Sequence, residues 1–133
     1  MTQVLCLSLK AQWYNMYECG EKKEEYREIT PYWIQRLMVL SDGKKIPRAL
    51  AEKIAQCSPT RLKLSVIQGR IRFKHYDLIR FSYGYTKRTL SYQSQGIYIG
   101  RGLHPEWGAP DKEVFILPIG LRVYELKLSD VDF

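Results

Sequence analysis

One short stretch, Glu18–Glu28, constrains the fold more than any other, because a helix end, a dense group of charges and a strand start follow one another within it (E-C-G-E-K-K-E-E-Y-R-E). A helical pattern runs up to Cys19. Gly20 then occupies the position at which helices commonly end in a left-handed residue, a conformation that glycine adopts without a Cβ penalty. The sequence therefore predicts a sharp turn at Gly20 with an extended segment beyond it.

The extended segment, Lys23–Ile29, carries charged groups of both signs. Because side chains alternate along a strand, Glu25 and Arg27 are expected on one face and Tyr26 on the other. Lys22 lies just after the turn, so an ammonium, a carboxylate and a guanidinium are close together in the sequence. The alternative is a solvated, salt-bridged surface strand, whose exposed ion pairs contribute little to stability.

The composition is that of a single globular domain spanning residues 1–133. The chain is 45% hydrophobic and 26% charged, which is typical of a protein with a core of ordinary size. No apolar run approaches the ~18 residues that span a bilayer, and the N-terminus lacks the order of a secretory signal. We therefore expect a cytoplasmic protein with no membrane partner. The three cysteines form no Cys-x-x-Cys pair, and we expect them to be reduced and mostly buried.

The net charge of +7 is concentrated in the middle of the chain. Residues 34–101 carry fourteen basic and three acidic side chains, whereas the segments on either side have small negative balances. A basic surface of this kind is what binding to a polyanion requires. A basic surface that serves solubility alone would give the same pattern.

The periodicity predicts an α+β domain with about three helices, six or seven short strands, and a curved sheet or small barrel. Helices are expected over Lys10–Cys19, over a segment that begins at Thr30-Pro31 and ends at Ser41-Asp42-Gly43, and over Ile46–Cys57. Strands are expected where residues alternate or form short apolar runs: Val4–Leu9, which has apolar residues on both faces, Tyr76–Tyr83, Gln95–Gly100, Glu113–Ile119 and Leu121–Leu128.

Between the third helix and the next strand, Arg61–Lys74 alternates between apolar residues and polar, mostly basic, residues on either side of Gln68-Gly69. This pattern predicts a β-hairpin that turns at Gln68-Gly69, with one apolar face and one basic face that includes Arg70 and Arg72. A basic ribbon is suited to contact with nucleic acid. An edge hairpin protected from aggregation by basic residues would look the same.

Most active-site signatures are absent from the sequence, which has no Gly-x-Ser-x-Gly elbow and no Walker phosphate loop. His75 and His104 have no partners at ligand spacing, so we expect neither a metal nor a cofactor. Two groups of residues are the candidates for chemistry: Lys22, Glu25 and Arg27 at the turn, and Arg101, Glu106 and Trp107 in a later loop.

These side chains suit phosphate and base recognition. Arg27 can bind a phosphate or a base edge in a bidentate manner, and Lys22 can act as an acid, a base or a phosphate clamp. Trp107 can stack on a base, an interaction worth ~1–3 kcal/mol. The alternative for Trp107 is a packing role, as a plug at the end of a barrel.

The stretch Gly20–Arg27 fits the pattern Gly-x-Lys-x-x-Glu-x-Arg of the ASCH domain family at all four fixed positions. The chain resembles this family over residues 4–40 and 76–120, and residues 44–74 look like an insertion. The segment I-Y-I-G-R-G-L-H-P-E-W-G-A-P is similar to that of small single-domain ASCH proteins of bacteria and their phages. The resemblance implies a PUA-like β-barrel with a cleft that Lys22, Glu25 and Arg27 face.

The resemblance also implies a ligand, because the family is thought to act on RNA or nucleotides. The first expectation is therefore an RNA- or nucleotide-binding domain. The residues expected to contact the ligand are Lys22, Glu25, Arg27, Arg70, Arg72, Arg101 and Trp107. Another possibility is an interaction module whose basic face binds an acidic protein.

The alternative function is that of an enzyme. The ASCH enzymes most similar in size are bacterial amidohydrolases that remove the acetyl group from acetylcytidine, using a lysine, a threonine three residues on and a distant glutamate. Lys22 matches the lysine and Glu106 is a candidate for the glutamate, but Glu25 replaces the threonine. A carboxylate is a poor nucleophile here, because its mixed anhydride is high in energy, although it can activate water. A ribonuclease that uses acid–base catalysis is the other enzymatic possibility.

Overall fold

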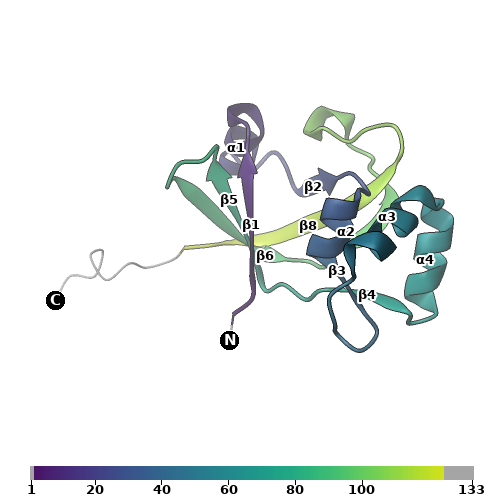
Figure 1. Cartoon of the computed structure of the whole chain (residues 1–133). Helices are drawn as coiled ribbons and strands as arrows, with labels where there is room; N and C mark the ends of the chain where they lie inside the picture. The colour runs from purple at the N-terminus through teal and green to yellow at the C-terminus, as the bar shows by residue number, and fades with distance from the viewer. Residues whose placement is uncertain (1, 125–133) are drawn as a thin grey trace. The chain divides into compact units, whose positions relative to one another are not determined.

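A computed structural model describes residues 2–124 of the chain (Figure 1). Within these residues there are four α-helices, one 3-10 turn and eight strands. The predicted α+β class is confirmed, with four helices instead of about three. The described chain forms two compact units: unit 1, which contains residues 2–23, 76–95 and 118–124, and unit 2, which contains Glu24–His75 and Gly96–Leu117.

Unit 1 consists of a sheet and one helix that contacts it. Its elements are β1 (Val4–Leu9), α1 (Ala11–Glu18), β5 (Leu78–Tyr83), β6 (Thr89–Ser94) and the C-terminal part of β8 (Glu113–Val123). Strand β1 pairs with β5 in parallel, and β5–β6 and β6–β8 are antiparallel. The β6–β8 register shifts between Tyr92 and Ser94, and a bulge of this kind bends a strand. The prediction of a curved sheet is therefore confirmed in this unit.

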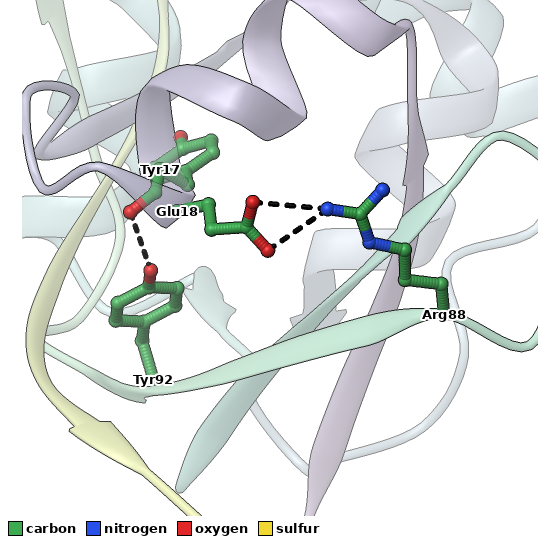
Figure 2. Close-up of polar contacts among 4 residues, drawn as sticks. All are labelled: Tyr17, Glu18, Arg88 and Tyr92. Atoms are coloured by element: carbon green, nitrogen blue, oxygen red, sulfur yellow. Dashed lines mark hydrogen bonds and ion pairs between the residues drawn. The ribbon is translucent and has the colours of Figure 1, made fainter.

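Helix α1 is held against the sheet of unit 1 by aromatic and polar contacts. The ring of Tyr17 stacks on Phe81 with centroids 4.1 Å apart. The hydroxyl of Tyr92 donates a hydrogen bond of 2.7 Å to the carbonyl of Tyr17, and Nη2 of Arg88 lies 2.9 and 3.0 Å from the two carboxylate oxygens of Glu18 (Figure 2). These contacts fix the last turn of α1, from which the Gly20 turn leaves.

Unit 2 contains the remaining elements: β2 (Glu24–Arg27), α2 (Pro31–Leu37), β3 (Met38–Leu40), α3 (Arg48–Gln56), α4 (Pro59–Ile67), β4 (Ile71–Phe73), β7 (Tyr98–Arg101), the 3-10 turn η1 (Pro105–Trp107) and the N-terminal part of β8. Strands β3 and β4 are antiparallel, as are β7 and β8, and β2 is a neighbour of β8. Helix α2 packs against α3, and α4 packs against β4 (Figure 1). The core includes fully buried Ile34, Ile46 and Phe115.

The helix that begins at Thr30-Pro31 is confirmed at its start, where Oγ1 of Thr30 accepts a hydrogen bond of 3.3 Å from the Trp33 amide. Its predicted end is wrong. The helix stops at Leu37, and Met38 is already extended because β3 pairs with β4 and buries Met38 and Val39.

The predicted hairpin over Arg61–Lys74 is also wrong over most of its length. Residues 59–67 form helix α4, which begins with Pro59 after Ser58, whose side chain accepts a hydrogen bond of 3.3 Å from the Arg61 amide. Gly69 turns the chain after this helix with φ of +75°. Only Ile71–Phe73 is a strand, and it pairs with β3.

The other predicted strands are partly confirmed. The strand expected over Val4–Leu9 is confirmed with the same ends. Those expected over Tyr76–Tyr83, Gln95–Gly100 and Glu113–Ile119 are confirmed with shifted ends, and β6 was not predicted. Strand β1 buries one face and not both. Residues 121–123 belong to β8, and the rest of the strand expected up to Leu128 lies outside the described residues, except for Tyr124, which is not in a strand.

The expectation of mostly buried cysteines is wrong, because all three thiols are exposed. Cys6 lies on the outward-facing side of β1 between two buried leucines. Cys19 and Cys57 are the C-cap residues of α1 and α3.

Candidate functional site

The boundary between the two units falls between Lys23 and Glu24, inside the Gly20–Arg27 motif. The motif therefore contributes Lys22 to unit 1 and both Glu25 and Arg27 to unit 2. Lys22 and Glu25 are buried in their units, and Arg27 is partly buried.

The turn at Gly20 is confirmed, with φ of +80°. The amide of Glu21 donates to the carbonyl of Met16 at 2.9 Å, and the amide of Gly20 donates to the carbonyl of Tyr17 at 3.0 Å. This pair of bonds is the Schellman motif, which satisfies carbonyls that the end of a helix leaves without partners. The amide of Lys22 also bonds to the Met16 carbonyl, at 3.1 Å, so the turn fixes the backbone of Lys22.

Lys22 lies against the aromatic face of helix α1. Its side chain is 3% exposed, and Nζ lies 4.7 Å from the ring centroid of Trp13 and 5.4 Å from that of Tyr17. A cation over an aromatic face is attracted by the ring quadrupole, more strongly when it is desolvated. The sequence analysis did not identify these two rings as partners of Lys22, although their spacing of four residues on a helix places them on one face.

In unit 2, Glu25 and Arg27 form an ion pair on one face of β2. Nη1 of Arg27 lies 2.5 Å from Oε2 of Glu25 and also donates to the Tyr26 carbonyl at 2.9 Å. The side chain of Glu25 is 3% exposed and that of Arg27 is 19% exposed. The alternative of a solvated surface strand is therefore contradicted for this pair.

The guanidinium of Arg27 also stacks on an aromatic ring of helix α2. Its Cζ lies 5.0 Å from the centroid of Trp33, and that of Arg36 lies 5.4 Å from the same ring. Nη1 of Arg36 donates to the hydroxyl of Tyr32 at 2.9 Å, and Tyr32 meets Trp33 edge to face. We call Arg27, Tyr32, Trp33 and Arg36 the Arg27–Trp33 surface. Arg36 shares a helix face with Trp33 because residues three apart on a helix are neighbours.

The opposite face of β2 is occupied by Tyr26, as alternation predicted. Tyr26 is buried with Val114 and Ile116, and Trp107 and Ala109 pack against this group. Burial, followed by the hydrogen bond from its hydroxyl to Glu24, raises the pKa of Tyr26 well above its usual range. Trp107 therefore packs on the face of β2 opposite to the one that carries Glu25 and Arg27.

The loop group makes its own contacts. The ring of His104 stacks on Trp107 with centroids 3.8 Å apart, and Nδ1 of His104 lies 2.8 Å from Oε1 of Glu106. A bond from its own backbone amide, followed by His104, lowers the pKa of Glu106. Arg101 forms an ion pair with Asp111. His104 thus contacts both Glu106 and Trp107, and Trp107 also packs against the Tyr26 group.

Arg70 and Arg72 do not lie on a continuous basic ribbon, because the preceding basic residues belong to helix α4. Both are exposed. The backbone carbonyl of Arg70 accepts a bond of 3.1 Å from Ser41, and the guanidinium of Arg72 lies over the turn at Gly43. The basic face predicted for residues 61–74 is therefore divided between a helix and a short strand.

Comparison of the chain with family models, with curated proteins and with solved structures found no match in any of the three. The resemblance to the ASCH family thus rests on the residues of the motif and its surroundings. Within residues 2–124, no three His, Cys, Asp or Glu side chains converge as a group that could hold a metal ion. No helix in this part of the chain has the length and apolar character needed to cross a membrane.

Proposed function

We propose that this chain binds RNA or a nucleotide, and that the Arg27–Trp33 surface of unit 2 forms part of the binding site. The observation that carries the proposal is the position of Arg27, which is held by buried Glu25 and stacked on the partly exposed ring of Trp33. An arginine fixed in this way loses little conformational freedom when it binds a ligand.

The chemistry of this surface suits a nucleic acid. Within the described chain, Arg27 makes its polar contacts through Nη1. The edge formed by Nε and Nη2 is therefore the part of the guanidinium that a phosphate or a base edge would meet. Unpaired bases stack on aromatic rings and on guanidinium planes, and this surface offers both. The excess of basic residues between positions 34 and 101 and the resemblance to the ASCH family support the same class of ligand.

The test is a titration of the protein into a short, fluorescently labelled single-stranded RNA, followed by anisotropy. Arg27→Lys keeps the charge beside Glu25 but removes the planar fork, so we expect RNA affinity to fall several-fold. Arg48→Lys, at a half-exposed arginine of α3, is the matched control and should bind like the wild type. Wild-type protein that binds neither RNA nor nucleotide, or an Arg27→Lys variant with undiminished affinity, would contradict the proposal.

Competition separates the two ligands named in the proposal. A mononucleotide that displaces the labelled RNA completely indicates a nucleotide pocket. RNA that stays bound at millimolar mononucleotide indicates recognition of a strand. Displacement by an acidic peptide and not by nucleotide would favour the interaction module.

A hydrolase on the same motif is the second candidate, either an amidohydrolase of acetylcytidine or a ribonuclease. It is favoured by the burial of two ionisable residues of the motif, Lys22 and Glu25, since buried ionisable groups are common in active sites. Incubation of the wild type and of Lys22→Ala with acetylcytidine and with RNA tests it. Turnover that is lost in a folded variant supports the enzyme, and a wild type without turnover contradicts it.

A further inference from the structure

Unit 1 contains a basic recess formed by residues that have no part in the function proposed above. A cavity of about 340 Å³ opens at the end of the sheet. It is lined by Lys87, Arg88, Thr89, Leu90, Ser91, Arg122, Val123 and Tyr124. This volume is at the lower end of the range for pockets that bind small molecules, ~300–1,000 Å³. We call it the Lys87–Arg122 recess.

The pairing of β6 with β8 brings these residues together. Ser91 is opposite Val123 and Tyr92 is opposite Arg122 in the antiparallel register. Lys87 and Arg88 immediately precede β6, so they enter the sheet at the end where β8 leaves it. The recess is therefore built from two strands and one turn of the same unit.

The charge of the recess is strongly one-sided. Three of its lining residues are cations, and no carboxylate of the described chain lines it. One of these cations, Arg88, is paired with the carboxylate of Glu18 on helix α1 (Figure 2). Cations that converge on a concave surface repel one another, and an anion in the recess would relieve that repulsion.

Two of the cations are held in place before any ligand binds. Arg88 contacts both oxygens of Glu18 and lies 5.1 Å from the ring centroids of Tyr14 and Tyr83, yet its side chain remains 53% exposed. Arg122 lies over the ring of Tyr124 at 4.6 Å. Arginines oriented by neighbouring groups are suited to the planar, bidentate recognition of phosphate oxygens.

We infer that the Lys87–Arg122 recess binds the phosphate group of a nucleotide or of an RNA strand. The ammonium of Lys87 and the guanidinium groups of Arg88 and Arg122 supply the donors, and the exposed ring of Tyr124 offers a face for an adjoining base. This inference extends the proposed function to a second surface. It does not depend on Arg27, because every residue it uses belongs to unit 1.

The test uses the full chain and the double variant Lys87→Ala/Arg122→Gln. Both side chains are exposed, so the variant should fold normally. Arg88 is left unchanged because it also anchors α1. The matched control is Lys44→Ala/Arg48→Gln, which removes the same charge from exposed positions of unit 2 (side chains 82% and 58% exposed). The probes are inorganic phosphate, AMP and a short single-stranded RNA.

Amide chemical shifts measured by NMR report binding directly. In the wild type and in the control, the amides of residues 87–91 should shift saturably with at least one probe, and in the double variant these shifts should disappear. Shifts with phosphate or AMP identify a free nucleotide as the source of the phosphate group, and shifts with RNA alone identify a strand. If RNA binds here, the slope of log K against log salt should be shallower in the double variant by ~1.4, since each phosphate contact on a single strand contributes ~0.7.

The inference is overturned if no probe moves these amides or if the double variant titrates like the wild type. Its failure is distinguishable from that of the proposed function, because Arg27→Lys should leave the shifts of residues 87–91 unchanged. If phosphate or AMP binds at the recess while Arg27→Lys leaves RNA affinity undiminished, the proposed function is refuted and this inference is supported.

Discussion

The carboxylate of Glu25 meets the guanidinium of Arg27 at 2.5 Å on one face of strand β2, with only one residue between them in the chain. The pair is mostly buried, and the guanidinium is also stacked on Trp33. An exposed pair at this spacing would contribute little to stability, whereas a buried one makes each partner depend on the other. Glu25 and Trp33 therefore orient the guanidinium of Arg27.

A double-mutant cycle on Glu25→Ala and Arg27→Ala should show this dependence. Each single change leaves a charge buried without this partner, so we expect each to lower the free energy of unfolding by about 3 kcal/mol. The coupling energy should be about 1–3 kcal/mol in urea denaturation. The exposed pair of Arg48 and Glu52 on α3 is the control, and its coupling should not exceed about 0.5 kcal/mol. Equal couplings for the two pairs would mean that the Glu25–Arg27 pair is effectively solvated.

Trp33→Leu should weaken RNA binding several-fold while the protein stays folded. Leucine keeps much of the apolar contact of the half-buried ring but removes the π face on which Arg27 and Arg36 stack. Anisotropy with labelled RNA measures the effect. The control is Tyr85→Leu, which removes an aromatic ring that is 99% exposed and should have no effect. Similar losses in both variants would show that binding responds to aromatic content in general.

Gly102→Ala should destabilise the protein by about 1–3 kcal/mol. A Cβ at this position would lie 2.7 Å from the ring of Tyr26 and 2.7 Å from the Cβ of Ala109. These atoms are part of the group that covers one face of β2, so they would have to move. Gly100→Ala is the control, because its Cβ would meet no atom closer than 3.6 Å. Thermal denaturation that gives the same midpoint for both variants would contradict the contact.

The carboxyl of Glu106 should titrate below its ordinary pKa of 4.5. A carboxyl whose pKa is lowered by folding contributes stability above the unfolded pKa, and that contribution is lost as the pH falls through the folded pKa. An NMR titration of the Glu106 carboxyl carbon measures it. His104→Ala should restore only part of the shift, because the larger cause is the bond from the backbone amide. A midpoint at or above 4.5 in the wild type would contradict this arrangement.

Local signals in the sequence were sufficient for several elements. Gly20 indicated a left-handed helix end, and Thr30-Pro31 indicated a capped helix start, because both depend on backbone chemistry within one turn. A cap of the same kind at Ser58-Pro59 begins α4, but the hairpin prediction rested on the alternation that follows it. Leu64 belonged to that apolar pattern, yet it is 51% exposed on α4.

The rest depends on contacts between distant parts of the chain, which periodicity does not encode. Met38 leaves the helix because Phe73 is available to pair with it. The burial of Lys22 depends on the rings of α1, and the position of Arg27 depends on Trp33 of α2. The motif therefore identified candidate residues, while their aromatic partners became evident only from the packing.

A crystal structure of the protein with a bound mononucleotide or short RNA tests the central proposal most directly. The proposal predicts density for a phosphate or a base edge within hydrogen-bonding distance of Nε or Nη2 of Arg27, with the ligand against the Arg27–Trp33 surface. A ligand bound elsewhere, with Arg27 in contact only with Glu25, the Tyr26 carbonyl and Trp33, would contradict it.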